Sequence, residues 1–124
     1  MEIIKTDKAP AAIGPYSQAA VAGGLVFVSG QLPLDPATGA LAEDAAQAAD
    51  RSLLNIAAIL EARGLTMADV VKVNIFLQNM EDFAAVNEVY AKHFSEPYPA
   101  RACVAVKALP KNAVLEIEAV AAVR

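Results

Sequence analysis

The order in which helical and strand-like segments alternate constrains the fold of this chain more than any other feature. Strand patterns cover residues 3–5, 17–22, 25–29, 70–77, 101–107 and 114–123, and helical patterns cover 44–63 and 81–94. The first two long strands flank Gly23-Gly24, which is a strong two-residue hairpin signal. The order predicts an α+β fold in which both helices pack on one face of a mixed sheet.

Each helical segment carries apolar residues at helical spacing, which predicts one buried face per helix. The stripe of the first helix is Ala49, Leu53, Ile56 and Leu60, and that of the second is Phe83, Val86, Tyr90 and Phe94. Asn87 lies within the second stripe, where its amide needs hydrogen-bond partners. Either a nearby loop supplies them, or Asn87 belongs to the wall of a site.

The chain is unusually apolar for its size. Hydrophobic residues make up 56% of its 124 residues, above the usual 45–50% or so. A single domain spanning residues 1–124 can bury a sufficient core without a disulfide or a metal. Because both helices are expected on one face of the sheet, the other face is left apolar, and we expect further copies of the chain to cover it.

Charge, cysteine content and hydropathy argue against several classes of protein. Fourteen acidic and ten basic residues give a net charge of −4 with no basic cluster, so we expect no nucleic-acid partner. The single cysteine, Cys103, permits no internal disulfide and fits a reducing compartment. Neither a signal peptide nor a membrane-spanning apolar run is present, which predicts a soluble cytoplasmic protein with no membrane association.

The strand-like segment 99–106 carries a charge near its start. Its period of two places Arg101, Cys103 and Ala105 on one face. An arginine on an otherwise apolar strand needs an anion or access to solvent, because burying an unpaired charge is costly. Two interpretations are therefore open. Arg101 reaches solvent or a structural carboxylate, or its guanidinium group binds the carboxylate of a ligand.

The last strand, 114–123, carries two carboxylates, Glu116 and Glu118, which share a face because they are two residues apart. The short turn before this strand predicts that it returns antiparallel beside 101–107. That pairing would bring one of the glutamates near Arg101 or Cys103, in a register that the sequence does not fix. The alternative is that both carboxylates are solvated.

The remaining polar residues favour neither covalent catalysis nor metal binding. His93, the only histidine, lies at a helix C-terminus that favours its positive charge, and Cys103 has no evident base beside it. Phosphate loops and metal-ligand spacings are missing, so no cofactor or metal is expected. Gly30 follows an apolar strand, where it either turns the chain or offers its N–H group to a ligand.

Six segments, in order along nearly the whole chain, resemble signatures of the RidA/YjgF family. They are residues 12–18, 27–33, 83–90, 99–104, 109–110 and 115–119. The resemblance implies a chorismate-mutase-like fold that assembles as a homotrimer with clefts between neighbouring subunits. It also implies hydrolysis of reactive 2-imino and enamino acids, such as 2-aminoacrylate, to 2-keto acids and ammonia. Such intermediates are released by pyridoxal-phosphate enzymes.

The family pattern also implies roles for individual residues. It places Arg101 on the substrate carboxylate and Glu116 at the attacking water, where a neighbouring guanidinium group would keep Glu116 ionised. The residues that match the cleft lining are Tyr16, Ser29, Gly30, Asn87 and Cys103. Two other classes stay open. One is a non-enzymatic small-acid-binding or chaperone-like protein, and the other is an endoribonuclease or translation inhibitor, which the charge of −4 disfavours.

Overall fold

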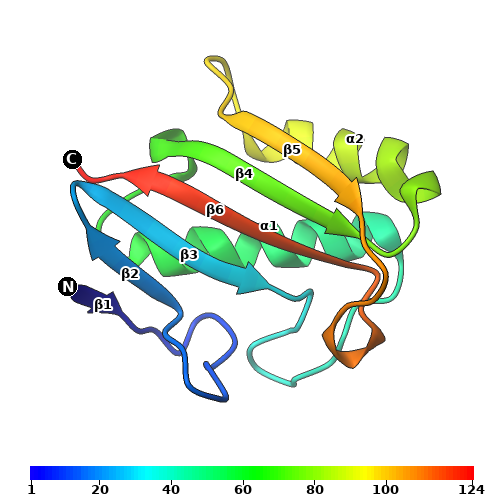
Figure 1. Ribbon diagram of the computed structural model, residues 1–124, viewed down its shortest axis with the longest axis horizontal. Coiled ribbons are helices and arrows are strands. Elements are labelled where there is room, and N and C mark those ends of the chain that lie inside the picture. The colour runs from blue at the N-terminus through cyan, green and yellow to red at the C-terminus, as the bar shows by residue number, and fades with distance from the viewer.

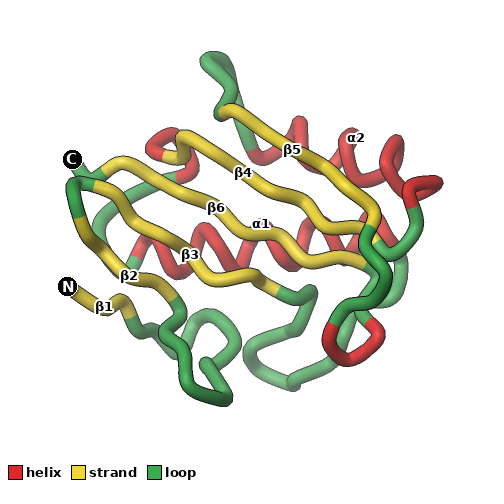
Figure 2. The backbone as a smooth tube through the Cα atoms, in the orientation of Figure 1, coloured by secondary structure: helices red, strands yellow, loops and turns green.

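A six-stranded mixed sheet with two helices on one face makes up the computed structural model, which describes residues 1–124 (Figure 1). The strands are β1 (Glu2–Ile4), β2 (Ala19–Ala22), β3 (Leu25–Gln31), β4 (Val70–Leu77), β5 (Ala100–Ala105) and β6 (Leu115–Ala122), and the helices are α1 (Ala45–Glu61) and α2 (Phe83–His93). Both helices lie behind the sheet in Figures 1 and 2, which leaves the other face of the sheet open. The predicted α+β class is confirmed.

The strand order is β1-β2-β3-β6-β4-β5, with β4 and β5 parallel and all other neighbours antiparallel. The prediction that the last strand pairs with the Arg101 strand is therefore wrong, because β4 separates β6 from β5. Residues 106–114, which connect β5 to β6, are too long for a tight hairpin and cross the end of β4. Every second residue of β6 is buried, as a central strand requires, whereas β5 is mostly exposed and lies at the edge.

The core lies between the helices and the covered face of the sheet. The largest fully buried side chains on the sheet are Val26, Val73, Ile75, Leu77, Leu115 and Ile117. All four residues of the predicted α1 stripe are buried, and so are Val86, Tyr90 and Phe94 of the α2 stripe. Phe83 departs from the prediction with 37% of its surface exposed, because α2 begins there, next to the edge strand.

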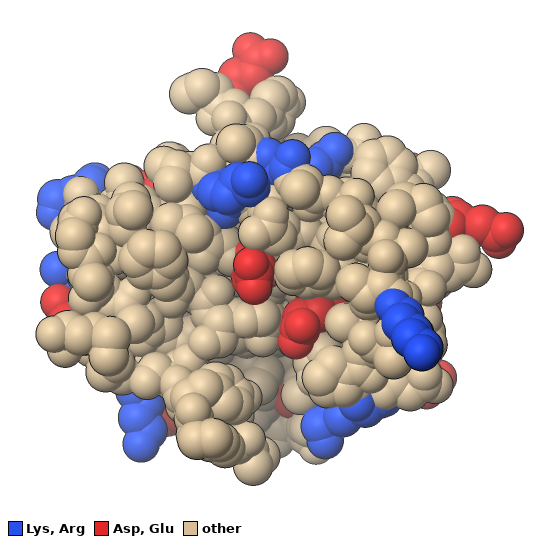
Figure 3. Space-filling view, in the orientation of Figure 1, with Lys and Arg blue, Asp and Glu red and all other residues tan.

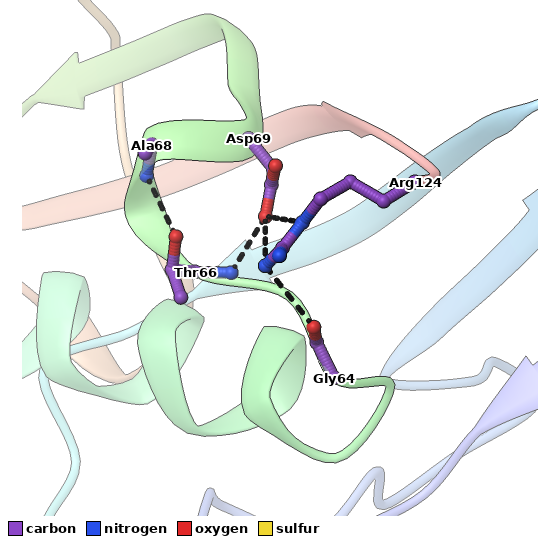
Figure 4. A network of polar contacts seen from close by, with 5 residues as sticks. All are labelled: Gly64, Thr66, Ala68, Asp69 and Arg124. Atoms are coloured by element: carbon purple, nitrogen blue, oxygen red, sulfur yellow. Dashed lines mark hydrogen bonds and ion pairs between the residues drawn. The ribbon is translucent and has the colours of Figure 1, made fainter.

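The C-terminal residue ties the end of the sheet to the turn after α1 (Figure 4). Asp69 accepts hydrogen bonds from the Thr66 N–H at 2.8 Å and from Arg124 Nε at 3.1 Å, and Arg124 also donates to the Gly64 carbonyl. The Thr66 N–H, with Arg124 in support, lowers the pKa of the Asp69 carboxyl below its ordinary value of 3.8. This network fixes the short helical turn Met67–Asp69 that leads into β4.

The open face of the sheet is largely uncharged, with a few acidic side chains near its middle (Figure 3). Phe27 on β3 and Val104 on β5 are nearly half exposed on this face. Phe27 pairs with Val120, which extends the apolar surface onto β6. The uncovered apolar face that the sequence predicts is thus present. Neither helix has the length and apolar character needed to cross a bilayer.

Candidate functional site

The candidate residues form two groups on opposite faces of the sheet. Across the strands, Cys103 pairs with Ile75 and Ile75 with Ile117, a row whose Ile75 and Ile117 side chains are buried beneath the helices. Arg101, two residues before Cys103, shares that face. The adjacent row, which runs from Val104 to Glu116, faces the open side. A single chain therefore does not bring Arg101 and Glu116 together.

Helix α2 holds the guanidinium group of Arg101 at the edge of the sheet. Arg101 Nη1 donates to Asn87 Oδ1 at 2.6 Å. The guanidinium carbon lies 4.7 Å from the ring centroid of Tyr90 and 5.7 Å from that of Phe83, which are cation–π distances. These contacts explain why a polar residue interrupts the α2 stripe. The amide of Asn87 fixes the arginine and is not used by a loop.

A cavity of about 470 Å³ lies beside this guanidinium group. It is lined by Asn87, Tyr90, Ala91, Tyr98, Pro99 and Arg101, none of which is acidic. Arg101 forms no ion pair with any Asp or Glu of the chain. One of its five N–H groups bonds to Asn87, which leaves the others available to an anion. The structure thus offers no structural carboxylate for Arg101.

Cys103 forms part of the same face and is half-buried against the core. Burial raises the pKa of its thiol, and the nearby positive charge of Arg101 only partly offsets this effect. A thiol with a raised pKa is a poor nucleophile at neutral pH. The only histidine is also engaged elsewhere, because His93 Nε2 lies 2.8 Å from Asp50 Oδ1 and links α2 to α1. Neither side chain is arranged for covalent catalysis.

The second group surrounds Glu116 on the open face. Between Val28 and Gln31, β3 has one residue more than β6, so a β-bulge places Ser29 and Gly30 opposite Glu118. A Cβ atom at Gly30 would lie 2.7 Å from Cδ of Glu116. One interpretation of the sequence was that Gly30 turns the chain, and the structure contradicts it, because β3 continues through Gly30 to Gln31. Gly30 lies inside β3, where the absence of a Cβ atom leaves room for the Glu116 carboxyl group in its observed position.

The surroundings of Glu116 differ from the sequence-based expectation of a neighbouring guanidinium group. Arg101 lies across the sheet, and Glu118 is the charged neighbour on the same strand face. Burial, and then the charge of Glu118, raise the pKa of Glu116 above its ordinary value of 4.5. Glu118 Oε2 in turn accepts a hydrogen bond from Asn74 Nδ2 at 3.0 Å. Asn74 was not among the predicted site residues, although a polar residue within apolar β4 was a signal for it.

Tyr16 and Ser29 lie at the end of the sheet where β3 bulges. The Ser29 hydroxyl donates to the Ser17 carbonyl at 2.5 Å, and its N–H donates to the Gln18 carbonyl. Buried Gln18 fixes the loop before β2, because its side chain accepts from the Thr6 N–H and donates to the carbonyl groups of Thr6 and Pro10. This leaves Tyr16 53% exposed at the end of that loop. Sequence reasoning missed Gln18.

Comparison with known proteins identifies the family. A family model described as Endoribonuclease L-PSP matches residues 6–123. The 2-iminobutanoate/2-iminopropanoate deaminase of Salmonella typhimurium is 50% identical over 121 residues, with 95% of this chain and 94% of that protein covered.

Two solved structures share the fold. RidA from the Antarctic bacterium Psychrobacter sp. PAMC 21119 is 50% identical in sequence, and its crystal structure matches with a TM-score of 0.95. The match covers 99% of this chain and 100% of the Psychrobacter chain. Escherichia coli TdcF with bound serine is 44% identical with a TM-score of 0.94 over the whole of both chains. The predicted resemblance is confirmed, and the chain belongs to the RidA/YjgF family.

Proposed function

We propose that this protein is a hydrolytic deaminase that converts reactive 2-imino and enamino acids, such as 2-aminoacrylate, to 2-keto acids and ammonia. The observation that carries the proposal is the guanidinium group of Arg101. It is fixed by Asn87 and Tyr90, has no carboxylate partner in the chain and faces a cavity. A planar guanidinium group with free N–H groups is suited to bidentate binding of a substrate carboxylate. The deaminase from Salmonella typhimurium supports the reaction class.

The active site that we propose is shared between subunits. Arg101 and Glu116 face opposite sides of one sheet, so a cleft that contains both groups needs a second chain. The uncovered apolar face around Phe27 and Val104 offers the surface for such an assembly. We therefore propose a homotrimer in which Arg101, Asn87 and Cys103 of one subunit face the open-face group around Glu116 of its neighbour.

In the proposed reaction the protein positions the substrate and moves a proton. The carbon of a protonated imine is already electrophilic, so neither a covalent nucleophile, a metal nor a cofactor is required. Arg101 binds the substrate carboxylate, and ionised Glu116 takes a proton from water as its oxygen bonds to that carbon. The resulting carbinolamine receives the proton on nitrogen. The C–N bond then breaks and releases ammonia, which takes up the proton of the hydroxyl group, so that a 2-keto acid and an ammonium ion are formed.

Arg101→Ala tests the carboxylate site. An amino-acid oxidase or a serine or threonine dehydratase generates the imine, and semicarbazide traps whatever is not hydrolysed. We expect kcat/KM to fall about 100-fold or more, because a charge-assisted hydrogen-bonded pair is lost. Arg63→Ala, which removes an arginine that pairs with Glu2 at 2.7 Å, serves as the control and should retain activity. Equal imine hydrolysis by wild type and Arg101→Ala would contradict the assignment.

Subunit mixing tests the shared site. Arg101→Ala and Glu116→Gln are each expected to be inactive alone. If the site joins two chains, then unfolding and refolding an equal mixture should restore about a quarter of the wild-type sites, because a quarter of neighbouring pairs supply both intact residues. If both residues acted within one chain, the refolded mixture would stay inactive.

A small-acid-binding protein without turnover is the second candidate. The structure of Escherichia coli TdcF with bound serine favours it, since serine carries a carboxylate that Arg101 would bind equally well. Turnover distinguishes the two functions: binding of a 2-amino or 2-keto acid without any acceleration of imine hydrolysis would favour the second. An endoribonuclease function, as in the family's description, is disfavoured by the net charge of −4 and by the lack of a cluster of basic residues in the sequence.

A further inference from the structure

We propose that Glu118, held in place by Asn74, is a positioning residue that allows Glu116 both to accept and to return a proton during imine hydrolysis. The inference rests on the function proposed above and adds a role for two residues. Neither residue contacts the substrate in this scheme. Each acts through Glu116.

The geometry separates the roles of the two glutamates. They lie on the same face of β6, roughly 7 Å apart along the strand. Asn74 stands directly opposite Glu118 on β4 and donates to its Oε2 atom at 3.0 Å. This bond turns the Glu118 carboxylate toward β4 and occupies one of its oxygens. Glu116 has no such donor, and its carboxyl group packs against Gly30.

Few charged groups face Glu116 from the neighbouring strands. On β3, the residues on this face are uncharged: Phe27, Ser29 and Gly30. On β4, Phe76 pairs with Glu116, and Lys72 lies further along beyond Asn74 without an ion pair to either glutamate. On β5, Ala102 and Val104 face the same side. Glu118 is thus the nearest charge to Glu116 within the chain, and its sign favours the protonated form of Glu116. In the proposed assembly the Arg101 guanidinium group of the neighbouring subunit has the opposite effect, so the contribution of Glu118 is measured as the difference between wild type and a variant that lacks its charge.

The proposed chemistry needs a carboxyl group that changes protonation state within one turnover. Glu116 must accept a proton from water and then return it to the leaving nitrogen. A carboxylate with low proton affinity performs the first step poorly, and general acid–base catalysis is most efficient when the pKa approaches the working pH. A fixed negative charge beside a half-buried carboxyl group moves the pKa in that direction.

Glu118→Gln is the test, because glutamine keeps an oxygen that accepts the Asn74 N–H and removes only the charge. The acidic limb of the kcat/KM–pH profile should move to lower pH, so that kcat/KM at a pH on this limb, relative to its value at pH 8, rises by up to about threefold. A 13C NMR titration of the Glu116 carboxyl carbon should shift in the same direction. Asn74→Ala should produce a smaller shift of the same sign, because it frees Glu118 to move toward solvent.

Glu61→Gln is the matched control. It changes the net charge equally at the exposed end of α1, behind the sheet, and should leave both profiles at their wild-type positions. Coincident Glu116 titrations in wild type and Glu118→Gln would overturn the inference, even in a fully active enzyme. A wild type that does not hydrolyse imines would instead overturn the proposed function, and the inference with it.

Discussion

Gly30→Ala tests directly whether the position of Glu116 matters. The new methyl group would lie 2.7 Å from Cδ, 3.0 Å from Oε2 and 3.1 Å from Cγ of Glu116. Carbon atoms in contact prefer separations of about 3.5–4.0 Å, so the carboxyl group must move by roughly 1 Å. These atoms belong to the end of a flexible side chain, which can rotate away without a shift of the backbone.

The expected result is a loss of activity without a comparable loss of stability. A displacement of about 1 Å in a catalytic group can lower the rate on the order of 100-fold. Alanine also restricts the unfolded chain, which offsets part of the crowding, so the free energy of unfolding should change by less than about 1 kcal/mol. Both quantities are measured on one preparation, as kcat/KM for imine hydrolysis and as the urea midpoint.

Gly64→Ala should have the opposite effect to Gly30→Ala, namely a loss of stability without a loss of activity. Gly64 has a φ of +76° and open space around its α-carbon. Alanine there strains the backbone and should lower the free energy of unfolding by about 1 kcal/mol, while activity per folded molecule is retained. If Gly30→Ala kept wild-type kcat/KM, the placement of Glu116 against the bulge would be irrelevant to the reaction, and its catalytic assignment would fail.

Two further predictions concern stability and pH. Asp69→Asn should lower the free energy of unfolding by about 1 kcal/mol at pH 7, because it removes the negative charge that strengthens the hydrogen bonds from the Thr66 N–H and from Arg124. The pKa of Asp69 is lowered in the fold, so this difference should be full above pH 3.8 and disappear as the pH falls further; urea titrations at several pH values measure it. Glu116→Gln should instead increase the stability of the fold. The pKa of Glu116 is raised, so the wild type loses stability as the pH rises above 4.5, and the glutamine variant should melt at a higher temperature than wild type at pH 8 but at the same temperature at pH 4, as calorimetry would show.

The elements could be predicted from the sequence because their signals are local. Gly23 and Gly24 have φ values of +61° and +78°, as the hairpin prediction requires. The α1 stripe followed from helical spacing alone. In contrast, the neighbours of β6 depend on which strands bury their alternate residues most completely, and this is a property of the whole sheet. Proximity in the chain suggested β5, whereas burial placed β6 between β3 and β4.

The sequence was enough to predict most residues of the candidate site, but not how these residues are arranged in space. Arg101 and Asn87 stand out because each interrupts an apolar pattern, and the structure brings them within 2.6 Å of each other. The contact between Gly30 and Glu116 arises from a bulge, and no local pattern encodes where a bulge falls. The partner of Asn74 likewise depends on the register between β4 and β6. Long-range register was the missing information.

The strand order also explains why assembly and catalysis belong together in the proposed function. Because β6 is central, Glu116 lies in the middle of the open face, among the apolar residues that need a cover. Because β5 is an edge strand, Arg101 lies at the rim of the molecule, where a neighbouring subunit can reach it. A contact that covers the apolar face of one chain with the rim of another buries hydrophobic surface and closes the cleft in the same step. Neither a monomer nor an assembly through the helices would bring the two groups together.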